Sequence, residues 1–282
     1  MLDRLVAAFS FRPVAFQIGV LVAATALPLI VAAGFTFESF SWRERERTRE
    51  DMLVRARTLA SAVDNEIKTN AAIGWSLAAS SKLREDDLAG FRTEAEAAIK
   101  FVPGSWLVLS RPDGQIVLDT LALPGAPLPT HPEPEILGQA AAIGKPLVAD
   151  LMVGPVSKKL MTYVEVPVFR NGAEAYSIAV VMDPARFLGL FKEKIADGEL
   201  VALLDRKKRF IARIPRHEFY LGRLASVGWR AAMAKSPEGW TDNQTWEGSV
   251  ALRRCPKTIA SFHETSARCC RSILDGMSLV SC

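Results

Sequence analysis

The residues that most often do chemistry in proteins are few and scattered in this sequence. His131 and His217 are isolated, and a lone histidine is far more often a surface or core residue than a ligand. His263 precedes Glu264 as in a phosphoacceptor pair, but the segment around them has no periodicity and no ATP-binding motif follows. We interpret that pair as coincidental, so the histidines predict no catalytic or metal centre.

The usual catalytic signatures are also absent from the sequence. It contains no G-x-x-x-x-G-K-[ST], G-x-G-x-x-G, G-x-S-x-G or H-E-x-x-H motif, which removes the common phosphate loops, the nucleophile elbow and the zinc helix. Asp119 and Glu165 fall in predicted strands, but nothing in one sequence brings them together as an acid–base pair. We therefore predict that the chain is not an enzyme and holds no cofactor.

All cysteines lie near the C-terminus, where the pattern of the chain changes. Cys255, Cys269, Cys270 and Cys282 have a spacing that matches no zinc motif, and the adjacent pair cannot easily form a disulfide. Residues 253–282 show neither alternation nor a helical stripe. We interpret this tail as foreign to the fold, from a shifted reading frame or a truncation, and predict no metal site there.

Composition indicates a folded protein without a nucleic-acid surface. The chain has 282 residues, of which 49% are hydrophobic and 23% charged, enough for one or two domains. Its formal net charge is +4. Most of that excess comes from five basic against two acidic residues in 253–282. The rest of the chain is nearly neutral, so it lacks the clustered basic charge of a nucleic-acid partner.

Residues 13–37 form an uninterrupted stretch without any charge. As a helix rising 1.5 Å per residue they would span about 37 Å, enough to cross a bilayer with some tilt. We predict a cytoplasmic start and a transmembrane helix over residues 1–40. Two alternatives stay open, a buried core helix and a signal peptide cleaved after the small residues 31–33.

The orientation of this segment in a membrane depends on how the arginines that follow it are interpreted. A literal positive-inside count places the C-terminal side in the cytoplasm, because six arginines follow the stretch within residues 43–57. They alternate with acidic residues at i,i+3, as in Arg43/Glu46 and Glu44/Arg47. A solvated helical surface explains them, so we predict that the following domain lies outside the cytoplasm.

A long amphipathic helix is predicted over about residues 42–80. Its apolar stripe steps by three or four positions. This stripe needs a partner, which is either a second copy in a homodimer or the sheet of its own domain. A second helix follows, capped by Asp86 or Asp87. The stripe consists of Leu53, Ala56, Leu59, Val63, Ile67, Ala71 and Trp75.

Beyond residue 104 the period changes from helical spacing to the alternation of strands. We predict a helix over 134–143 and another opened by Asp183 as N-cap with Pro184 at its first position. Turn residues separate the strands, as at Arg111–Gly114. The predicted strands are 106–110, 115–120, 147–152, 159–169 and 173–182.

A second, smaller unit is predicted after residue 198. Strands over 199–205 and 209–214 repeat the earlier hairpin, and a helix over 224–234 and a strand over 240–246 follow. The predicted domains are thus 1–40, 41–197 and 198–252, with 253–282 as an atypical tail.

Several segments together resemble the extracytoplasmic double Cache sensor region of bacterial sensor histidine kinases, especially the HWE type. The resemblance implies an α+β fold with PAS-like antiparallel sheets, placed outside a bacterial inner membrane that is crossed once. It also implies further modules, so the second Cache subdomain is expected to be incomplete and the chain truncated before its kinase module. The segments are "LASAVDNEI", "SLAASSKL", "SWLVLSRPDGQIVLDTLALPGAPLP", "VPVFRNGAEAYSIAVVMDPARFLGLF" and "LVALLDRKKRFIARIPRHEFYLG".

In a Cache fold the ligand pocket lies on one face of the central sheet, which implies a set of binding residues. An aromatic wall with one carboxylate would suit a small amine or amino acid. The arginine and paired aromatic of amino-acid-binding members are not evident. Core packing of the aromatic residues and helix capping by Asp183 are the alternatives. The candidates are Trp106, Asp119, Tyr163, Tyr176 and Asp183.

The sequence thus predicts a membrane-anchored ligand sensor of a two-component receptor that lacks its output module. Its expected partners are a small-molecule ligand, the membrane and a second copy through the long helix. The alternative is a truncated or frameshifted product that acts only as a small-molecule binding module or has no function.

Overall fold

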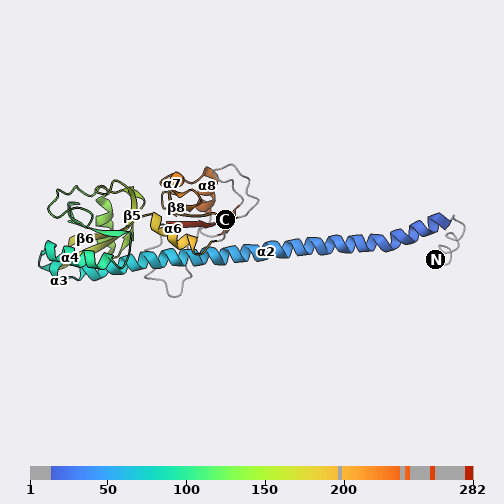
Figure 1. Ribbon diagram of the computed structural model, residues 1–282, viewed down its shortest axis with the longest axis horizontal. Helices are drawn as coiled ribbons and strands as arrows, with labels where there is room; N and C mark the ends of the chain where they lie inside the picture. The colour runs from blue at the N-terminus through green and yellow to red at the C-terminus, as the bar shows by residue number, and fades with distance from the viewer. Residues whose placement is uncertain (1–13, 196–198, 236–238, 242–254, 258–276, 282) are drawn as a thin grey trace. The chain divides into compact units, whose positions relative to one another are not determined.

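The computed structural model describes residues 14–195, 199–235, 239–241, 255–257 and 277–281. It divides into two units, Met1–Asp51 and Met52–Cys282. Helix α2 (Val14–Ala78) begins in the first unit and ends in the second (Figure 1). In the part of the chain described here, no helix has the length and apolar character needed to cross a membrane. The prediction of a transmembrane helix from the charge-free stretch 13–37 is therefore not supported.

Within the second unit, the predicted apolar stripe of α2 packs on the sheets of its own chain. Ala56, Leu59, Val63 and Ile67 are all buried. Of these, Leu59, Val63 and Ile67 belong to the same hydrophobic cluster as the sheet residues. Trp75, by contrast, is 40% exposed. Of the two partners considered for the stripe, its own domain therefore occupies it over these positions.

Two helices follow α2 and close one end of this core. Helix α3 (Ser81–Arg84) was not predicted, and α4 (Leu88–Ile99) was. Asp87 caps α4, because its Oδ1 accepts a hydrogen bond from the Gly90 amide at 2.9 Å. Phe91 is completely buried on the inner face of α4. The cap and the inner face agree with the sequence prediction.

The first sheet is antiparallel and has the strand order β2-β1-β6-β5-β3, with β4 also paired to β5. The predicted strand over 147–152 is divided into β3 and β4, while the other four predicted strands lie within two residues of their expected bounds. The strands are β1 (Ser105–Ser110), β2 (Ile116–Asp119), β3 (Leu147–Val148), β4 (Met152–Val153), β5 (Leu160–Arg170) and β6 (Ala173–Met182).

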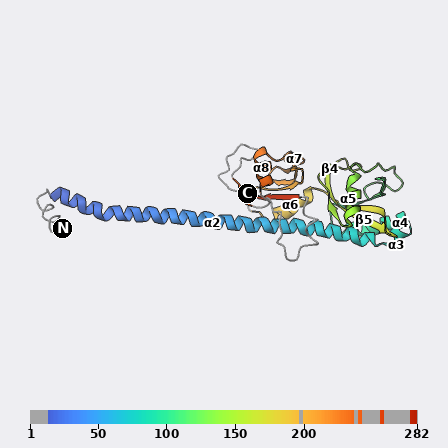
Figure 2. The same cartoon turned by 180° about the vertical axis from the view of Figure 1, so that it is seen from behind.

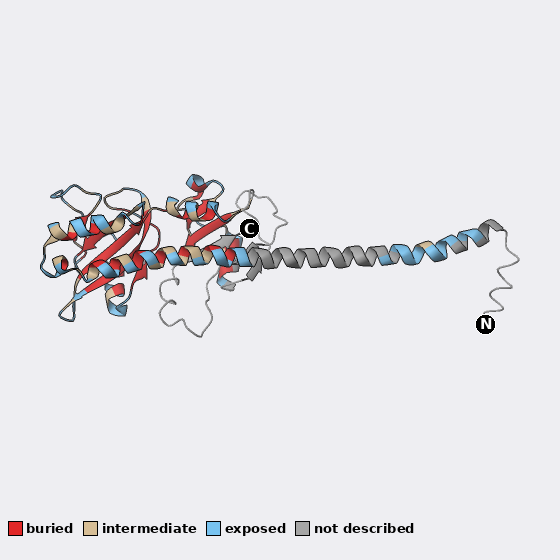
Figure 3. Ribbon diagram, turned by 60° about the horizontal axis from the view of Figure 1, so that its bottom comes forward, coloured by how far each residue is buried: buried red, intermediate tan, exposed pale blue. Residues whose placement is uncertain are grey.

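Both faces of this sheet are covered. Alternate side chains such as Val164 and Val180 share a core with α2 and α4, whereas Tyr163 and Val181 share one with α5 (Glu135–Ile143). Helix α5 lies against β5 in Figure 2. Figure 3 accordingly colours the central strands as buried along most of their length. We name the surface under α5, which carries Tyr163 and Val181, the α5 face.

The second sheet has the order β11-β7-β8. In the chain, one short helix precedes β7 and two follow β8. Its elements are α6 (Ala185–Lys192), β7 (Val201–Asp205), β8 (Phe210–Ile214), α7 (His217–Tyr220), α8 (Val227–Lys235) and β11 (Met277–Ser281). Beside them β9 (Gly239–Thr241) pairs with β10 (Cys255–Lys257).

The C-terminal tail contributes to this sheet, which differs from the prediction that 253–282 is foreign to the fold. Strand β11 pairs antiparallel with β7, with Met277 opposite Asp205 and Ser281 opposite Val201. Five residues at the end of a chain are too short to show a clear alternation, so the sequence pattern misses them. The predicted strand over 240–246 is described only up to Thr241.

Close approach of α2 to the sheet depends on Gly74. A Cβ placed there would lie 2.6 Å from Val166 Cγ2, and a valine has a stiff branched side chain that cannot move aside easily. We predict that Gly74→Ala lowers the free energy of unfolding by about 1–3 kcal/mol. The matched control is Gly189→Ala in α6, where a Cβ meets nothing within 4 Å. Urea unfolding of both variants checks this, and equal stability of the two would contradict it.

Candidate ligand-binding site

Two of the predicted ligand residues meet in one row of the α5 face. Trp106 on β1 pairs with Val181 on β6, which pairs with Tyr163 on β5. Paired residues of antiparallel strands point to the same side of a sheet. Trp106 and Tyr163 are both buried in the cluster that includes α5. The two aromatic side chains therefore share one covered surface.

The next row of the same face carries two carboxyl groups, one on β2 and one on β5. Asp119 pairs with Val108, Val108 with Ala179, and Ala179 with Glu165. Three strand spacings separate Asp119 from Glu165, which is about 14 Å along the row. The two acids therefore share a face but are too far apart to act as a direct acid–base pair.

Tyr163 is the largest completely buried side chain of this face. Its phenol oxygen has no hydrogen-bond partner within the described part of the chain, although the residue is 0% exposed. The ring of His131 meets the Tyr163 ring edge-on, with centroids 5.8 Å apart. Burial raises the pKa of the Tyr163 phenol well above its usual range, and the charge of Glu165 raises it further. The neutral phenol hydroxyl of Tyr163 is therefore buried without a hydrogen-bond partner among the described residues.

Glu165 is buried beside Tyr163, two positions further along β5, and is 1% exposed. Its Oε1 accepts a hydrogen bond from the Ser177 hydroxyl, whereas none of the described residues donates to Oε2. Burial raises the pKa of Glu165 to about 7, against the lowering effect of the Ser177 hydrogen bond. Among the described residues, no lysine or arginine forms a salt bridge with this carboxyl.

Asp119 is also buried, but it is better satisfied than Glu165. Its Oδ1 accepts a hydrogen bond from the Leu121 amide at 2.8 Å, at the turn that ends β2. Burial raises the pKa of this carboxyl, and the amide hydrogen bond and the charge of Arg92 partly oppose the rise. Asp119 therefore contributes negative charge to the α5 face and also closes a local turn.

The proline-rich loop and α5 cover this face. The His131 amide donates to the Gly114 carbonyl at 2.7 Å, and His131 Nδ1 accepts from the Glu133 amide at 3.1 Å. Burial lowers the pKa of His131, which favours the neutral ring. Leu137 and Ala140 of α5 complete the apolar part of the cover. The loop thus brings a neutral histidine against Tyr163.

The structure places the other two predicted residues away from this face. Tyr176 packs in the core on the α2 side, and its hydroxyl donates to Asp86 Oδ1 at 2.8 Å. Asp183 follows β6, where its Oδ1 accepts from the Ala185 amide at 2.8 Å. Core packing, the alternative given for Tyr176, describes its position. Helix α6 begins at Ala185 with Pro184 as its N-cap residue, so the helix starts one residue later than predicted and Asp183 precedes the cap position.

Sequence reasoning missed three polar residues of the α5 face. His131, Glu165 and Ser177 are all buried. The alternation of β5 carried a signal for Glu165, because it stands two residues after the predicted Tyr163 and therefore points the same way. For His131 no comparable signal exists, since a loop brings it there. Within the described residues, no group of three or more histidine, cysteine or acidic side chains could hold a metal ion.

Comparison with known proteins bears on the fold. The chain matches no protein-family model, and no curated protein is significantly similar to it in sequence. Solved structures do resemble it. The extracellular domain of rpHK1S-Z16, described as a histidine kinase, has a TM-score of 0.65 and 13% identity over 83% of this chain and 93% of that chain. The chain therefore shares the fold of this extracellular domain.

Two further sensor domains have the same fold. The ligand-binding domain of the Campylobacter jejuni chemoreceptor Tlp3, in complex with 4-methylisoleucine, has a TM-score of 0.60 and 10% identity, covering 84% of this chain and 90% of that chain. The sensor domain of the V. cholerae histidine kinase DctB has a TM-score of 0.56 and 10% identity, covering 82% of this chain and 95% of that chain. The likeness confirms the predicted α+β sensor fold.

The raised pKa of Glu165 predicts a pH dependence of stability. Between its ordinary pKa of 4.5 and about 7, the folded state holds a proton that the unfolded state has lost. The contribution of Glu165 to stability is therefore fully favourable below pH 4.5 and falls until about pH 7, by up to about 3 kcal/mol. Glu165→Gln should abolish this decline.

The measurement is urea unfolding from pH 4.5 to 8. Glu135→Gln, on the exposed side of α5, is the matched control and should keep the pH profile of the original chain. An unchanged profile in Glu165→Gln would show that the carboxyl ionises normally.

Proposed function

We propose that the chain is the extracytoplasmic ligand-sensing region of a sensor kinase of the HWE type, with its ligand bound on the α5 face. The observation that carries this proposal is a pair of buried oxygens, Tyr163 Oη and Glu165 Oε2, for which the described residues provide no hydrogen-bond partner. More than nine in ten buried polar groups in folded proteins are paired. Two such groups side by side on one face are satisfied when a ligand supplies their partners.

The charge of the face favours an amine over an acid as the ligand. Glu165 and Asp119 bring two carboxyl groups to the face, and the described residues give Glu165 no cationic partner. An ammonium group would donate to Glu165 Oε2, lower its pKa and lie within reach of the Trp106 and Tyr163 rings. A ligand carboxylate would instead meet like charge. We therefore propose a small organic amine without a carboxylate.

Some of the solved sensor domains with this fold hold amino acids in their own structures. Tlp3 domains hold L-valine or isoleucine, and the Pseudomonas aeruginosa PctB domain holds L-Arg. These ligands carry both an amine and a carboxylate. In this chain Glu165 offers a partner to an amine, and the described residues place no cation beside it that could pair with a ligand carboxylate, so we propose that only the amine half of such a ligand is recognised.

A matched pair of small molecules tests this proposal. Isobutylamine is L-valine without its carboxylate, so the two differ only in the group that the face is expected to reject. Isobutylamine should bind the purified full chain at least tenfold more tightly than L-valine and raise its melting temperature accordingly. Glu165→Gln should weaken isobutylamine binding at least tenfold, and Glu135→Gln should leave it unchanged. The measurement is calorimetric titration. If neither isobutylamine nor L-valine binds, the result contradicts the proposal.

Membrane anchoring and pairing of two copies belong to the same proposal. Anchoring rests on the charge-free residues 13–37, whose described large side chains, such as Leu27, Leu29 and Ile30, are all more than half exposed. Exposed apolar side chains in such a row need an apolar partner. A homodimer would use the part of α2 that the sheets leave uncovered.

Cell fractionation tests the anchor. The full chain should sediment with the membranes of a bacterial host, and a variant lacking residues 1–40 should remain in the supernatant, because it has lost the apolar stretch. A second variant with Arg55→Gln, at an exposed ion pair with Glu199, should still sediment. Recovery of the full chain in the supernatant would contradict anchoring.

A further inference from the structure

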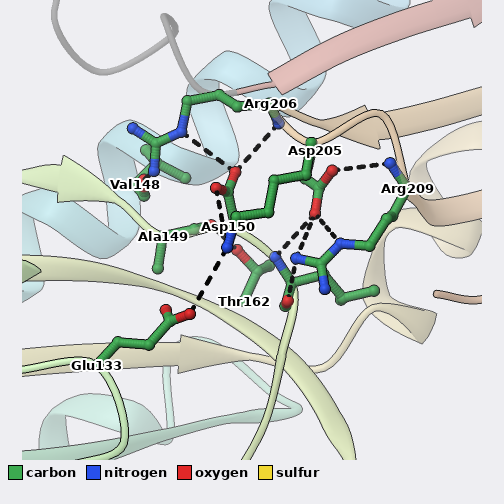
Figure 4. A network of polar contacts seen from close by, with 10 residues as sticks. Glu133, Val148, Ala149, Asp150, Thr162, Asp205, Arg206 and Arg209 are labelled. Carbon is green, nitrogen blue, oxygen red and sulfur yellow. Dashed lines mark hydrogen bonds and ion pairs between the residues drawn. The ribbon is translucent and has the colours of Figure 1, made fainter. Parts of the chain in front are cut away.

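The turn between β7 and β8 reaches from the second sheet to the edge of the first. Figure 4 shows this network: Arg206 of the turn faces Val148, at the end of β3, and Asp150, in the segment that connects β3 to β4. Beside it, Asp205 at the end of β7 faces Arg209. We name residues 148–151 the rim. The rim and the turn belong to the two subdomains that the sequence predicts, so their contacts join one to the other.

An ion pair forms the outer half of the network. Asp150 Oδ1 accepts from the Arg206 amide at 3.1 Å and from Arg206 Nε at 3.2 Å. Arg206 Nη2 also donates to the Val148 carbonyl at 3.1 Å. Lys207 adds weaker ion pairs to Asp150 at 4.0 Å and to Glu133 at 3.7 Å. One arginine thus holds both a side chain and the backbone of the rim.

The inner half of the network is buried. Asp205 is 0% exposed, and its two oxygens accept from Arg209 N and Arg209 Nε, each at 2.8 Å. The Leu151 amide donates to Asp205 Oδ2 at 3.3 Å, and Arg209 Nη2 donates to the Leu151 carbonyl. Both peptide groups of Leu151 are therefore fixed by the turn of the other sheet.

The same rim is bonded to the strand that carries the candidate ligand residues. The Ala149 amide donates to the Tyr163 carbonyl at 2.8 Å, and Thr162 Oγ1 donates to the Ala149 carbonyl at 2.7 Å. Just before the rim, Leu147 pairs with Glu165. Ala149 also packs in the apolar cluster of Tyr163. A shift at Tyr163 or Glu165 therefore acts directly on backbone that the turn holds.

We infer that the β7–β8 turn positions the rim of the ligand site, and that ligand bound at Tyr163 and Glu165 changes the order of the second sheet through it. This inference rests on the proposed function, because it needs a ligand on the α5 face. Coupling between two sites is reciprocal in free energy. Loosening the turn must then alter ligand affinity, and ligand must alter the turn.

The outer ion pair is the place to test this inference. Arg206 is partly exposed, so Arg206→Gln removes the guanidinium contacts to Asp150 and Val148 without opening a buried cluster, and only the backbone amide bond to Asp150 remains. Asp205 is unsuitable, because its loss would leave Arg209 and the Leu151 amide unpaired in the interior. Arg170→Gln is the matched control, because Arg170 forms a partly exposed ion pair with Asp86 that does not involve the rim.

The experiment is hydrogen–deuterium exchange of the full chain with and without isobutylamine. In the original chain and in Arg170→Gln, isobutylamine should slow exchange of amides 201–214 at least threefold. In Arg206→Gln this slowing should be lost and the dissociation constant should rise two- to tenfold. Exchange protection in 201–214 that is the same in Arg206→Gln would overturn the inference and leave the proposed function intact. No binding of isobutylamine to the original chain would overturn both.

Discussion

A sheet that is covered on both faces leaves no solvent for the side chains of its central strands, and the rest of this structure depends on that constraint. Every residue of β5 from Met161 to Val168 is buried. A polar group there must find a protein partner or another molecule. Thr162 finds the Ala149 carbonyl. Tyr163 Oη and Glu165 Oε2 find no partner among the residues that the structure describes, which is why the candidate site lies there.

Two covers create this burial, and they differ in how firmly they are built. Helix α2 packs closely on one face, where Gly74 permits contact with Val166. On the other face a proline-rich loop and α5 lie over the polar groups. His131 of this loop is held by a hydrogen bond from its amide to the Gly114 carbonyl and by one from the Glu133 amide to its Nδ1. The rim beside this loop is fixed by Arg206 and Asp205 of the second sheet. Ligand affinity and the state of the second sheet are therefore linked through one short segment.

Much of the fold could be predicted from the sequence, since it follows from local patterns. The alternation beyond residue 104, the turns and the cap at Asp87 each depend on neighbouring residues. The site is different, because it depends on strand order and register. Asp119 and Glu165 share a row only because β2, β1, β6 and β5 lie side by side in that order. Tyr176 is also a tyrosine, but it faces the opposite core from Tyr163. The two residues are 13 positions apart on different strands, with a hairpin between them, so their spacing does not show which face of the sheet each one occupies.

The central claim is that a ligand supplies the missing partners of Tyr163 and Glu165, and a ligand-bound crystal structure tests it most directly. The chain should be crystallised with isobutylamine. The account predicts the nitrogen within hydrogen-bond distance of Glu165 Oε2, with the alkyl group against Trp106 or Tyr163. An amine seated elsewhere on the chain, with both oxygens of the α5 face still unpaired, would contradict it.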